Sequence, residues 1–413
     1  MLLGKIFKSS KLRLLCCAFL FLLHCMARIV VLGGGFGGFY ALKTLSSELK
    51  SEHEVTLIDR SDRFVYLPSL PYLISEKKSA EELTERYESI AKRYGADFIK
   101  GEVALIDLDA RSIQLRDGRE YDYDYLIIAA GATTEYYGIP GAEKTCPAWR
   151  LEDYNRMIEE LRKLGEPRNV CVVGGGLTGL EVAGEMLEVL GPGRVTILEK
   201  MKILMPALNS PKAAEVAEKF LVSKGARIIK GNGVVRVDEN ELCLESGERV
   251  SCDMIIWAVG VRASPIELRG RVERVGRGGW IRVKPNLQLT NYENVYAIGD
   301  INHFAVDTDC AMKMAEEAIL QGKLAARNIA AQIRGERSLL VHKPIFLSSK
   351  PKSLVSLGFD KAILVWDKKI TFGRTPYMTK MFIETAVMRD IKGRVAGGLL
   401  TSIESTILKT ISR

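Results

Sequence analysis

The chain of 413 residues is longer than one ordinary hydrophobic core, so its length predicts two or three domains. Hydrophobic residues make up 47% and charged residues 27%, a composition that excludes a largely disordered chain. The net charge is +8, and residues 341–413 alone contain thirteen Lys and Arg against five Asp and Glu. Apolar residues alternate with these basic ones, which favours an anionic lipid surface, and not nucleic acid, as the partner of this region.

Residues 1–25 carry four basic residues ahead of an apolar run at 14–23, a pattern that resembles a signal peptide. Ten apolar residues are too few to span a bilayer, which needs about 20. The simplest interpretation is that translation begins at Met26 and that the first strand follows at once. A membrane anchor or a signal peptide is the alternative.

The first motif lies between two apolar, β-branched runs. Gly33, Gly35 and Gly38 have the G-x-G-x-x-G spacing, after a predicted strand and before a predicted helix. The missing side chains let the turn tighten and let backbone N–H groups approach a pyrophosphate, which the positive end of the helix dipole stabilises. Asp59 ends the second run 21 residues after Gly38, where a carboxylate can accept hydrogen bonds from ribose hydroxyls. These features together predict a dinucleotide site.

Two later strands are predicted to end beside this site. Residues 125–133 form a buried strand that runs into the small-residue turn at Ala130 and Gly131, where backbone can approach a ligand closely. Residues 294–300 form another strand that ends on Asp300. A long helix is then expected over roughly 310–333, with Asp309 as its N-cap.

The same signal recurs about 140 residues later. Gly174, Gly176 and Gly179 repeat the spacing after an apolar strand, and Glu199 follows Gly179 by 20 residues. Two such motifs predict two dinucleotides bound face to face, as a flavin relay requires. A carboxylate at Glu199 favours NADH because it accepts hydrogen bonds from a free 2′-hydroxyl and repels a 2′-phosphate, although Lys200 weakens this discrimination.

The cysteines and histidines predict no metal site. No C-x-x-C occurs among the eight cysteines, and the four histidines are isolated from one another. Cys171 lies in an apparent strand and is expected to be a small buried hydrophobe. The scattered cysteines are interpreted as free thiols in a reducing compartment.

The segments VVLGGGFGGFYA, VVGGGLTGLEVAGE, WAVGVRASP and NVYAIGD occur in the order seen in flavoprotein reductases with two dinucleotide folds. The chain resembles the type II NADH:quinone oxidoreductases over about 28–333. The resemblance implies an α/β fold of two Rossmann-like domains, with the NADH domain inserted in the FAD domain, and a C-terminal membrane-associating region. The implied boundaries are 1–25 for an N-terminal extension, 26–150 and 280–340 for the FAD domain, 151–279 for the NADH domain, and 341–413 for the C-terminal region.

The resemblance also implies the site residues. The FAD contacts are Gly33, Gly35, Gly38, Asp59, Arg60, Ala130, Gly131 and Asp300. The NADH contacts are Gly174, Gly176, Thr178, Gly179, Glu199 and Gly260. Glu181 matches a family carboxylate near the contact between flavin and nicotinamide, where it would tune hydride transfer or deliver protons; its alternative is an exposed first-turn glutamate. Glu316 is the second candidate for proton uptake.

The implied activity is that of a non-proton-pumping respiratory NADH dehydrogenase with a membrane quinone as acceptor. One departure bears on that acceptor, because Glu316 and Leu320 stand where the family's quinone-site helix often carries two glutamines. A sulfide:quinone oxidoreductase, a soluble NADH-dependent reductase of an electron carrier and a redox-sensing flavoprotein remain as alternatives. The sulfide enzyme needs a reactive cysteine pair, and no cysteine follows Cys310, although Cys146 and Cys310 remain available as a pair.

The C-terminal region is expected to meet the membrane through amphipathic helices. One stripe consists of Leu399, Leu400, Ile403, Ile407 and Ile411, and a second consists of Met378, Met381, Phe382, Thr385 and Met388. These features predict a peripheral protein on the cytoplasmic face of the cell membrane. A helix docked on the protein core, or a homodimer face, would produce the same stripes.

Overall fold

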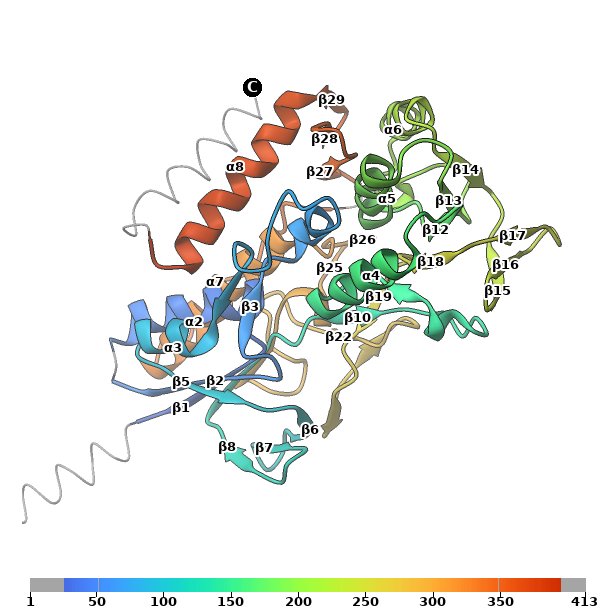
Figure 1. The fold of residues 1–413 in the computed structure, drawn as a ribbon. Helices are drawn as coiled ribbons and strands as arrows, with labels where there is room; N and C mark the ends of the chain where they lie inside the picture. The colour runs from blue at the N-terminus through green and yellow to red at the C-terminus, as the bar shows by residue number, and fades with distance from the viewer. Residues whose placement is uncertain (1–25, 51, 348, 395–413) are drawn as a thin grey trace, which may run out of the picture.

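The computed structural model describes residues 26–50, 52–347 and 349–394. Its first sheet has five parallel strands in the order β23-β9-β1-β2-β5 (Figure 1). Their bounds are Arg28–Leu32 for β1, Glu54–Asp59 for β2, Asp97–Lys100 for β5, Tyr125–Ile128 for β9 and Val295–Ala297 for β23. Because β23 follows the others by more than 160 residues, the chain leaves this unit, builds a second one and returns.

Helices α2 (Phe36–Leu49) and α7 (Ala315–Ile333) lie side by side along the first sheet (Figure 1). The two helices can approach closely because Gly322 has no side chain. A Cβ at that position would overlap the carbonyl oxygen of Gly37. The expected start of α7 near residue 310 is wrong. Asp309 and Cys310 form the short strand β26, and the chain stays extended up to the N-cap residue Met314. Asp309 instead accepts a hydrogen bond from the backbone N–H of Ser349 (3.0 Å), so it anchors a loop.

The second sheet repeats the first in the order β11-β18-β12-β13-β14, and all its pairings are parallel. The strands are Cys146–Pro147 (β11), Val170–Val173 (β12), Val195–Glu199 (β13), Arg227–Lys230 (β14) and Met254–Trp257 (β18). Its helices are α4 (Leu151–Leu164), α5 (Leu177–Leu190) and α6 (Pro211–Ser223). The predicted α/β fold of two Rossmann-like units is confirmed.

The prediction that the cysteines are scattered free thiols is wrong for one pair, because Cys171 and Cys252 form a disulfide. Cys171 is buried as expected, in β12. Cys252 lies two residues before β18, the parallel neighbour of β12, and the two Cα atoms are 5.9 Å apart. Sequence spacing hides this pair because 81 residues separate its members.

Smaller elements surround the two sheets. The first unit carries β3 (Arg63–Val65), β4 (Thr84–Arg86), α3 (Tyr87–Arg93), β6 (Val103–Asp107), β7 (Ser112–Leu115), β8 (Glu120–Asp122), β20 (Glu267–Arg269), β21 (Arg274–Val275), β22 (Trp280–Arg282), β24 (Asn302–His303) and β25 (Ala305–Val306). The second carries β15 (Val234–Asp238), β16 (Glu241–Leu244) and β17 (Arg249–Ser251). The two connections between the units pair with each other as β10 (Ala132–Thr134) and β19 (Val261–Ala263).

The described C-terminal part is a three-stranded antiparallel meander followed by one long helix. The elements are β27 (Lys352–Ser356), β28 (Ala362–Trp366), β29 (Lys369–Gly373) and α8 (Arg374–Ile391). Within residues 26–394, no helix has the length and apolar character needed to cross a bilayer. The stripe from Leu399 to Ile411 and the extension 1–25 lie outside the described residues.

Helix α8 is attached to both Rossmann-like units by ion pairs whose α8 members are buried. Asp390 pairs with Lys43 of α2 (2.5 Å), and Lys380 pairs with Glu181 of α5. The Glu384 carboxylate lies 2.7 Å from the Lys78 ammonium, and Lys78 follows the 3₁₀ helix Leu67–Leu73. All three α8 side chains are buried, together with apolar ones such as Val387 and Ile391, so this helix docks through a face that is partly charged and partly apolar.

Candidate functional site

The first glycine motif forms the turn between β1 and α2. Gly33 has φ of +97°, and a Cβ there would overlap the carbonyl oxygen of Ala129 at the end of β9. A Cβ at Gly38 would overlap the carbonyl oxygen of Gly33, so this glycine lets α2 pack onto the turn. Gly35 differs, because no atom lies within 4 Å of its Cβ position. It is the N-cap of α2 and makes no side-chain capping bond, which leaves the N-terminal N–H groups facing open space.

Asp59, at the end of β2, lies against this turn. Its carboxylate accepts hydrogen bonds from the backbone N–H groups of Gly34 (2.7 Å) and Ser61 (2.8 Å). Burial raises the pKa of Asp59, while the two backbone hydrogen bonds act in the opposite direction. Arg60 follows directly and is exposed. The carboxylate is therefore held in place beside the open space at Gly35.

The ends of β9 and β23 complete the border of the first site, as the parallel topology requires. Gly131 has φ of +63° with open space at its Cβ position, and the Ser264 hydroxyl donates to the carbonyl of Ala130 (2.7 Å). Asp300 lies in the 3₁₀ turn Gly299–Ile301 after β23. Burial raises the pKa of Asp300, and the charge of Lys313 lowers it.

Sequence reasoning missed Lys313 as part of this border. Its ammonium lies 4.6 Å from the centre of the Trp280 ring and donates to the carbonyl of Asn302. Burial lowers the pKa of Lys313, and Asp300 opposes that effect. No local pattern marks a lone lysine in a loop before a helix, so only the fold identifies it.

The second glycine motif reproduces the first. Gly174 has φ of +106°, a Cβ at Gly179 would overlap the carbonyl oxygen of Gly174, and the Cβ position of Gly176 has open space around it. Glu199 ends β13 and accepts hydrogen bonds from the backbone N–H groups of Gly175 (2.8 Å) and Met201 (2.7 Å). The same arrangement of turn, open N-terminus and carboxylate therefore occurs twice.

Three neighbours modify the second site. The ammonium of Lys200 pairs with Glu245 (2.8 Å), which gives this cation a partner other than Glu199. Thr178 lies half-buried in the first turn of α5. Gly260 is exposed, with φ of +131°, beside the Tyr137 hydroxyl.

The two predicted proton carriers have different surroundings. Glu181 is buried in α5 and accepts hydrogen bonds from the Lys380 ammonium and from the backbone N–H of Ser356 (3.0 Å). Glu316 is exposed in the first turn of α7. Burial raises the pKa of the Tyr66 phenol well above its usual value. The charges of Glu316 and Glu181 both raise this pKa further. Both carboxylates therefore act electrostatically on the Tyr66 phenol.

The Cys146 thiol of the sulfide alternative is poorly suited to nucleophilic chemistry. The Cys146 thiol donates to Glu160 (2.7 Å) at the edge of the second sheet. Burial raises its pKa to about 12, so the thiol is protonated at neutral pH. Cys310 lies in β26 beside the first site.

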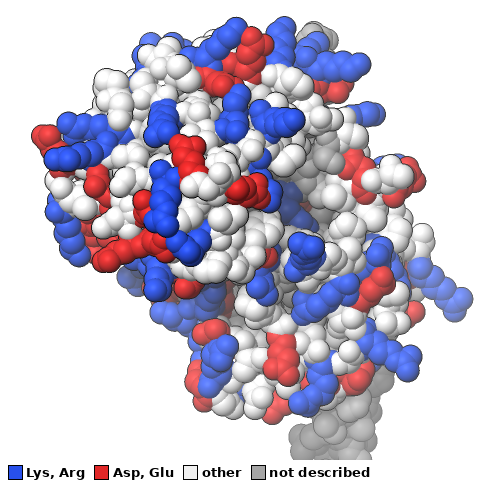
Figure 2. Space-filling model, turned by 90° about the vertical axis from the view of Figure 1, so that its right-hand side faces the viewer, with Lys and Arg blue, Asp and Glu red and all other residues white. Residues whose placement is uncertain are grey.

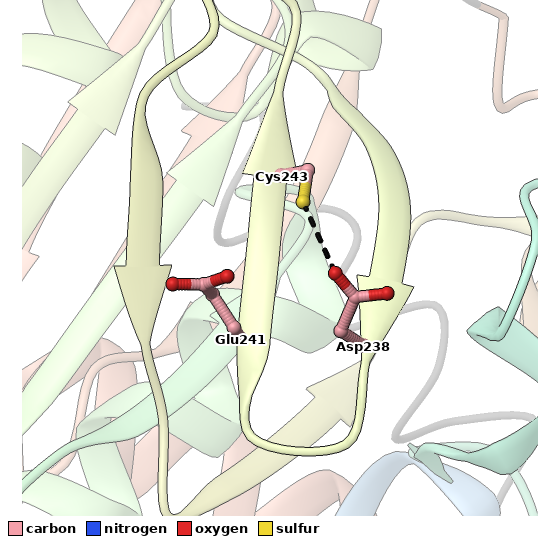
Figure 3. A group of neighbouring side chains, drawn as sticks. All are labelled: Asp238, Glu241 and Cys243. Carbon is pink, nitrogen blue, oxygen red and sulfur yellow. Dashed lines mark hydrogen bonds between the residues drawn. The ribbon is translucent and has the colours of Figure 1, made fainter.

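Among residues 26–50, 52–347 and 349–394, one group of possible metal ligands lies close together, namely Asp238, Glu241 and Cys243 on the hairpin of β15 and β16. Figure 3 shows the Cys243 thiol pointing toward the Asp238 carboxylate, 3.5 Å away. Both carboxylates already have cationic partners, since Arg236 pairs with Asp238 (2.9 Å) and Arg249 with Glu241 (2.6 Å). Figure 2 shows acidic and basic side chains interspersed over this side of the molecule.

The family model described as "Pyridine nucleotide-disulphide oxidoreductase" matches residues 27–322. The demethylphylloquinone reductase NdbB of Synechocystis sp. is 30% identical over 82% of this chain and 86% of its own length. A type II NADH:quinone oxidoreductase of Staphylococcus aureus is 26% identical over 88% of this chain and 95% of its own. The predicted resemblance and the oxidoreductase class are confirmed by these relatives.

Two solved structures have the same fold. The sulfide:quinone oxidoreductase of Aquifex aeolicus superposes with a TM-score of 0.80 at 18% identity, over 93% of this chain and 95% of its own. NDH2 of Plasmodium falciparum, in complex with NADH, superposes with a TM-score of 0.76 at 17% identity, over 88% and 97%. At these identities the likeness supports the fold alone.

Proposed function

Because the chain belongs to the pyridine nucleotide-disulphide oxidoreductase family, we propose that it is an FAD-dependent NADH:quinone oxidoreductase. The main observation behind this proposal is that the same turn occurs twice. In each copy a glycine, Gly35 or Gly176, leaves space at a helix N-terminus beside a carboxylate held by hydrogen bonds. A side chain at either position would fill the space that a pyrophosphate needs, so the residues present fit two dinucleotides. The quinone specificity stated for both relatives supports the acceptor.

FAD belongs in the first site and NADH in the second. When bound, FAD supplies a two-electron carrier between nicotinamide and quinone. The α2 N-terminus would hold its pyrophosphate, and Asp59 its ribose. The cradle formed by Gly131, Asp300 and the Lys313 cation would fix its other end. Hydride transfer depends on alignment of the two rings, so the main task of these residues is to position the rings and exclude water.

Glu199 supports NADH over NADPH. Its carboxylate can accept hydrogen bonds from a free ribose 2′-hydroxyl and repels a 2′-phosphate. Lys200 would favour the phosphate, but its ammonium is paired with Glu245. NADH specificity therefore depends on Glu199, because the neighbouring Lys200 ammonium is paired with Glu245.

The quinone reaction takes up protons, and Glu181 and Glu316 are the residues proposed to supply them. Glu181 accepts a hydrogen bond from the Lys380 ammonium, which would hold a proton donor beside this carboxylate. Glu316 and Leu320 replace the usual glutamines, which makes this side of the ring more acidic and more apolar than in the family pattern.

Peripheral attachment to the cytoplasmic face of the membrane would bring the enzyme to its quinone. On α8, Met378 and Phe382 are 54% and 52% exposed and Thr385 is exposed, whereas Met388 is buried against the core. The exposed part of this stripe is available for the interface of an anionic leaflet. A homodimer would cover the same residues.

One assay tests the proposal. The purified yellow protein is mixed without oxygen with NADH, NADPH or sulfide, and flavin bleaching is followed by absorbance. A short-chain quinone is then added. The proposal expects fast bleaching by NADH and recolouring by quinone. Bleaching by sulfide in place of NADH, or a reduced flavin that quinone leaves bleached, would refute it.

A further inference from the structure

A cluster of buried polar side chains lies behind Glu181, where α5 meets the loop 67–77 and β27. Glu185 is one helical turn after Glu181 on the same buried face of α5. It is fully buried, with an exposed fraction of 0%. One oxygen, Oε2, accepts a hydrogen bond from the Ser75 hydroxyl and lies 3.1 Å from the Lys77 ammonium. The other oxygen, Oε1, has no hydrogen-bond partner within the described part of the chain.

Two hydroxyl groups, those of Ser356 and Tyr72, lie near Glu181. The backbone N–H of Ser356 donates to Glu181, which places the Ser356 side chain beside that carboxylate. The Tyr72 ring lies 5.4 Å below the Lys380 ammonium, which is itself bonded to Glu181. The hydroxyl oxygens of Ser356 and Tyr72 are both buried, and neither has a hydrogen-bond partner among the described residues. Such atoms are rare in native proteins and call for a specific cause.

The outer end of the cluster reaches the surface. Lys77 connects Glu185 to Glu188, to which its ammonium lies 2.6 Å away. The Lys77 side chain is 18% exposed and that of Glu188 is 29% exposed. Glu188 is also held by the backbone N–H of Phe359 (2.6 Å). Polar side chains therefore extend from the surface at Lys77 and Glu188 inward to Glu185, and the charges of Glu185 and Glu181 both raise the pKa of Tyr72.

We infer that Glu185 is a proton-relay residue, which takes protons from solvent at the Lys77–Glu188 end and passes them through the Tyr72 and Ser356 hydroxyls to Glu181. The inference rests on the proposed function, in which NADH, one proton and quinone give NAD⁺ and quinol. One proton must therefore enter per turnover. Each hydroxyl accepts a proton and releases another, so it ends the transfer unchanged.

The electrostatic surroundings suit a carboxyl that is protonated more readily than usual. Burial raises the pKa of Glu185, the Ser75 hydrogen bond and Lys77 lower it, and Glu188 raises it. The other charged and titratable groups that face this region are Glu181 on α5, Tyr72 on the loop, and Lys380, Glu384 and Tyr377 on α8. Burial, followed by the charge of Glu181, raises the pKa of Tyr72, so its phenol stays protonated and can act as a relay.

The test uses the full-length protein with bound FAD and the variant Glu185→Gln, which keeps the shape of the side chain and removes its titration. We expect flavin bleaching by NADH to be unchanged, because hydride transfer takes up no proton. Recolouring by a short-chain quinone should slow by about tenfold or more; general acid–base catalysis typically contributes about 100-fold or more. The rate of recolouring in Glu185→Gln should fall further in D₂O than the wild-type rate does. The wild-type rate should decline at high pH, and the rate of the variant should not. Glu185→Asp should restore part of the rate.

Asp390→Asn is the matched control. Asp390 is also a buried carboxylate with one lysine partner and one unpartnered oxygen, but it lies at the far end of α8 beside α2. Its variant should leave both half-reactions unchanged. Lys77→Met tests the outer end of the path independently, and covers the case in which Glu185→Gln does not fold.

Quinone recolouring at the wild-type rate over the whole pH range, in Glu185→Gln or in Lys77→Met, would overturn the relay alone. An equal slowing in Asp390→Asn would also overturn it, because the effect would then follow from any buried carboxylate. A wild-type protein that passes no electrons to quinone would remove the proposed function and the relay together.

Discussion

The two glycine turns share one local geometry but differ in what surrounds them. The first is enclosed by two passes of the chain, because β23, Asp300 and α7 return to it after the second unit is complete. Aromatic rings also pack around it: the centre of the Phe36 ring lies 5.2 Å from that of Phe64 and 5.4 Å from that of Tyr66. The second turn is bordered by aliphatic side chains such as Leu204 and by the exposed Gly260.

This difference separates a retained cofactor from an exchanged one. A ligand in the first site is held by segments far apart in sequence, so its release requires several elements to separate. A ligand in the second site meets one continuous unit and an exposed rim, so it can leave after each turnover. An FAD that stays bound and an NADH that turns over need this asymmetry.

The largest expected effect distinguishes the packing glycine of the first turn from the ligand-facing one. Gly38→Ala places a methyl group into the carbonyl oxygen of Gly33, so we expect it to cost about 4 kcal/mol or more of unfolding free energy and all bound flavin. Gly35→Ala meets no protein atom, so it should fold normally and still lose flavin. Thermal unfolding of the flavin-free proteins and the flavin absorbance measure the two effects. Equal stability of both variants would contradict this division of roles.

The next effect concerns the attachment of α8 to the second site. Lys380→Met leaves the buried Glu181 carboxylate without its cation, and removal of one partner of a buried pair costs about 3–5 kcal/mol. Lys43→Met is the corresponding change at the first site, where Lys43 is 30% exposed. It should cost less, because water reaches that pair. Chemical denaturation measures both, and a larger loss in Lys43→Met would reverse the expected order.

Sequence patterns predicted the parts of these sites that depend on local backbone geometry. Gly38 and Gly179 let a helix pack directly onto the turn before it, so their spacing between a predicted strand and a predicted helix indicates the two turns. The carboxylates of Asp59 and Glu199 follow at a distance set by one helix and one strand. These features lie within about 30 residues of one another, which is the range over which spacing is informative.

The features that were missed depend on contacts between distant segments. Lys380 reaches Glu181 across 199 residues, and Cys171 reaches Cys252 through the pairing of two parallel strands. Helix α7 starts later than its composition suggests, because Cys310 pairs in β26 and Ala311 pairs with Leu347, which helix-like composition does not reveal. In each case tertiary pairing decided the outcome.

A smaller effect tests the carboxylate of the second site. Glu199→Gln keeps the hydrogen-bonding shape but removes the charge, and a hydrogen bond to a charged group contributes about 1.5–3 kcal/mol. We expect the KM for NADH to rise by about tenfold or more, with flavin content unchanged, because the first site is untouched. Asp59→Asn is the companion variant and should lower flavin content. A normal KM for NADH in Glu199→Gln would show that this carboxylate does not contact the nicotinamide cofactor.

The smallest expected effect concerns the cation beside Glu199. Glu245→Gln removes the partner of Lys200 and frees its ammonium to approach a 2′-phosphate. Both side chains are substantially exposed, and exposed ion pairs contribute about 0–1 kcal/mol, so the ratio of kcat/KM for NADPH to that for NADH should rise by no more than about fivefold. Lys200→Met in the same background should abolish the gain, since no cation then remains to attract the phosphate. If Glu245→Gln leaves the ratio unchanged while Glu199→Gln alters it, the carboxylate alone determines the choice of cofactor.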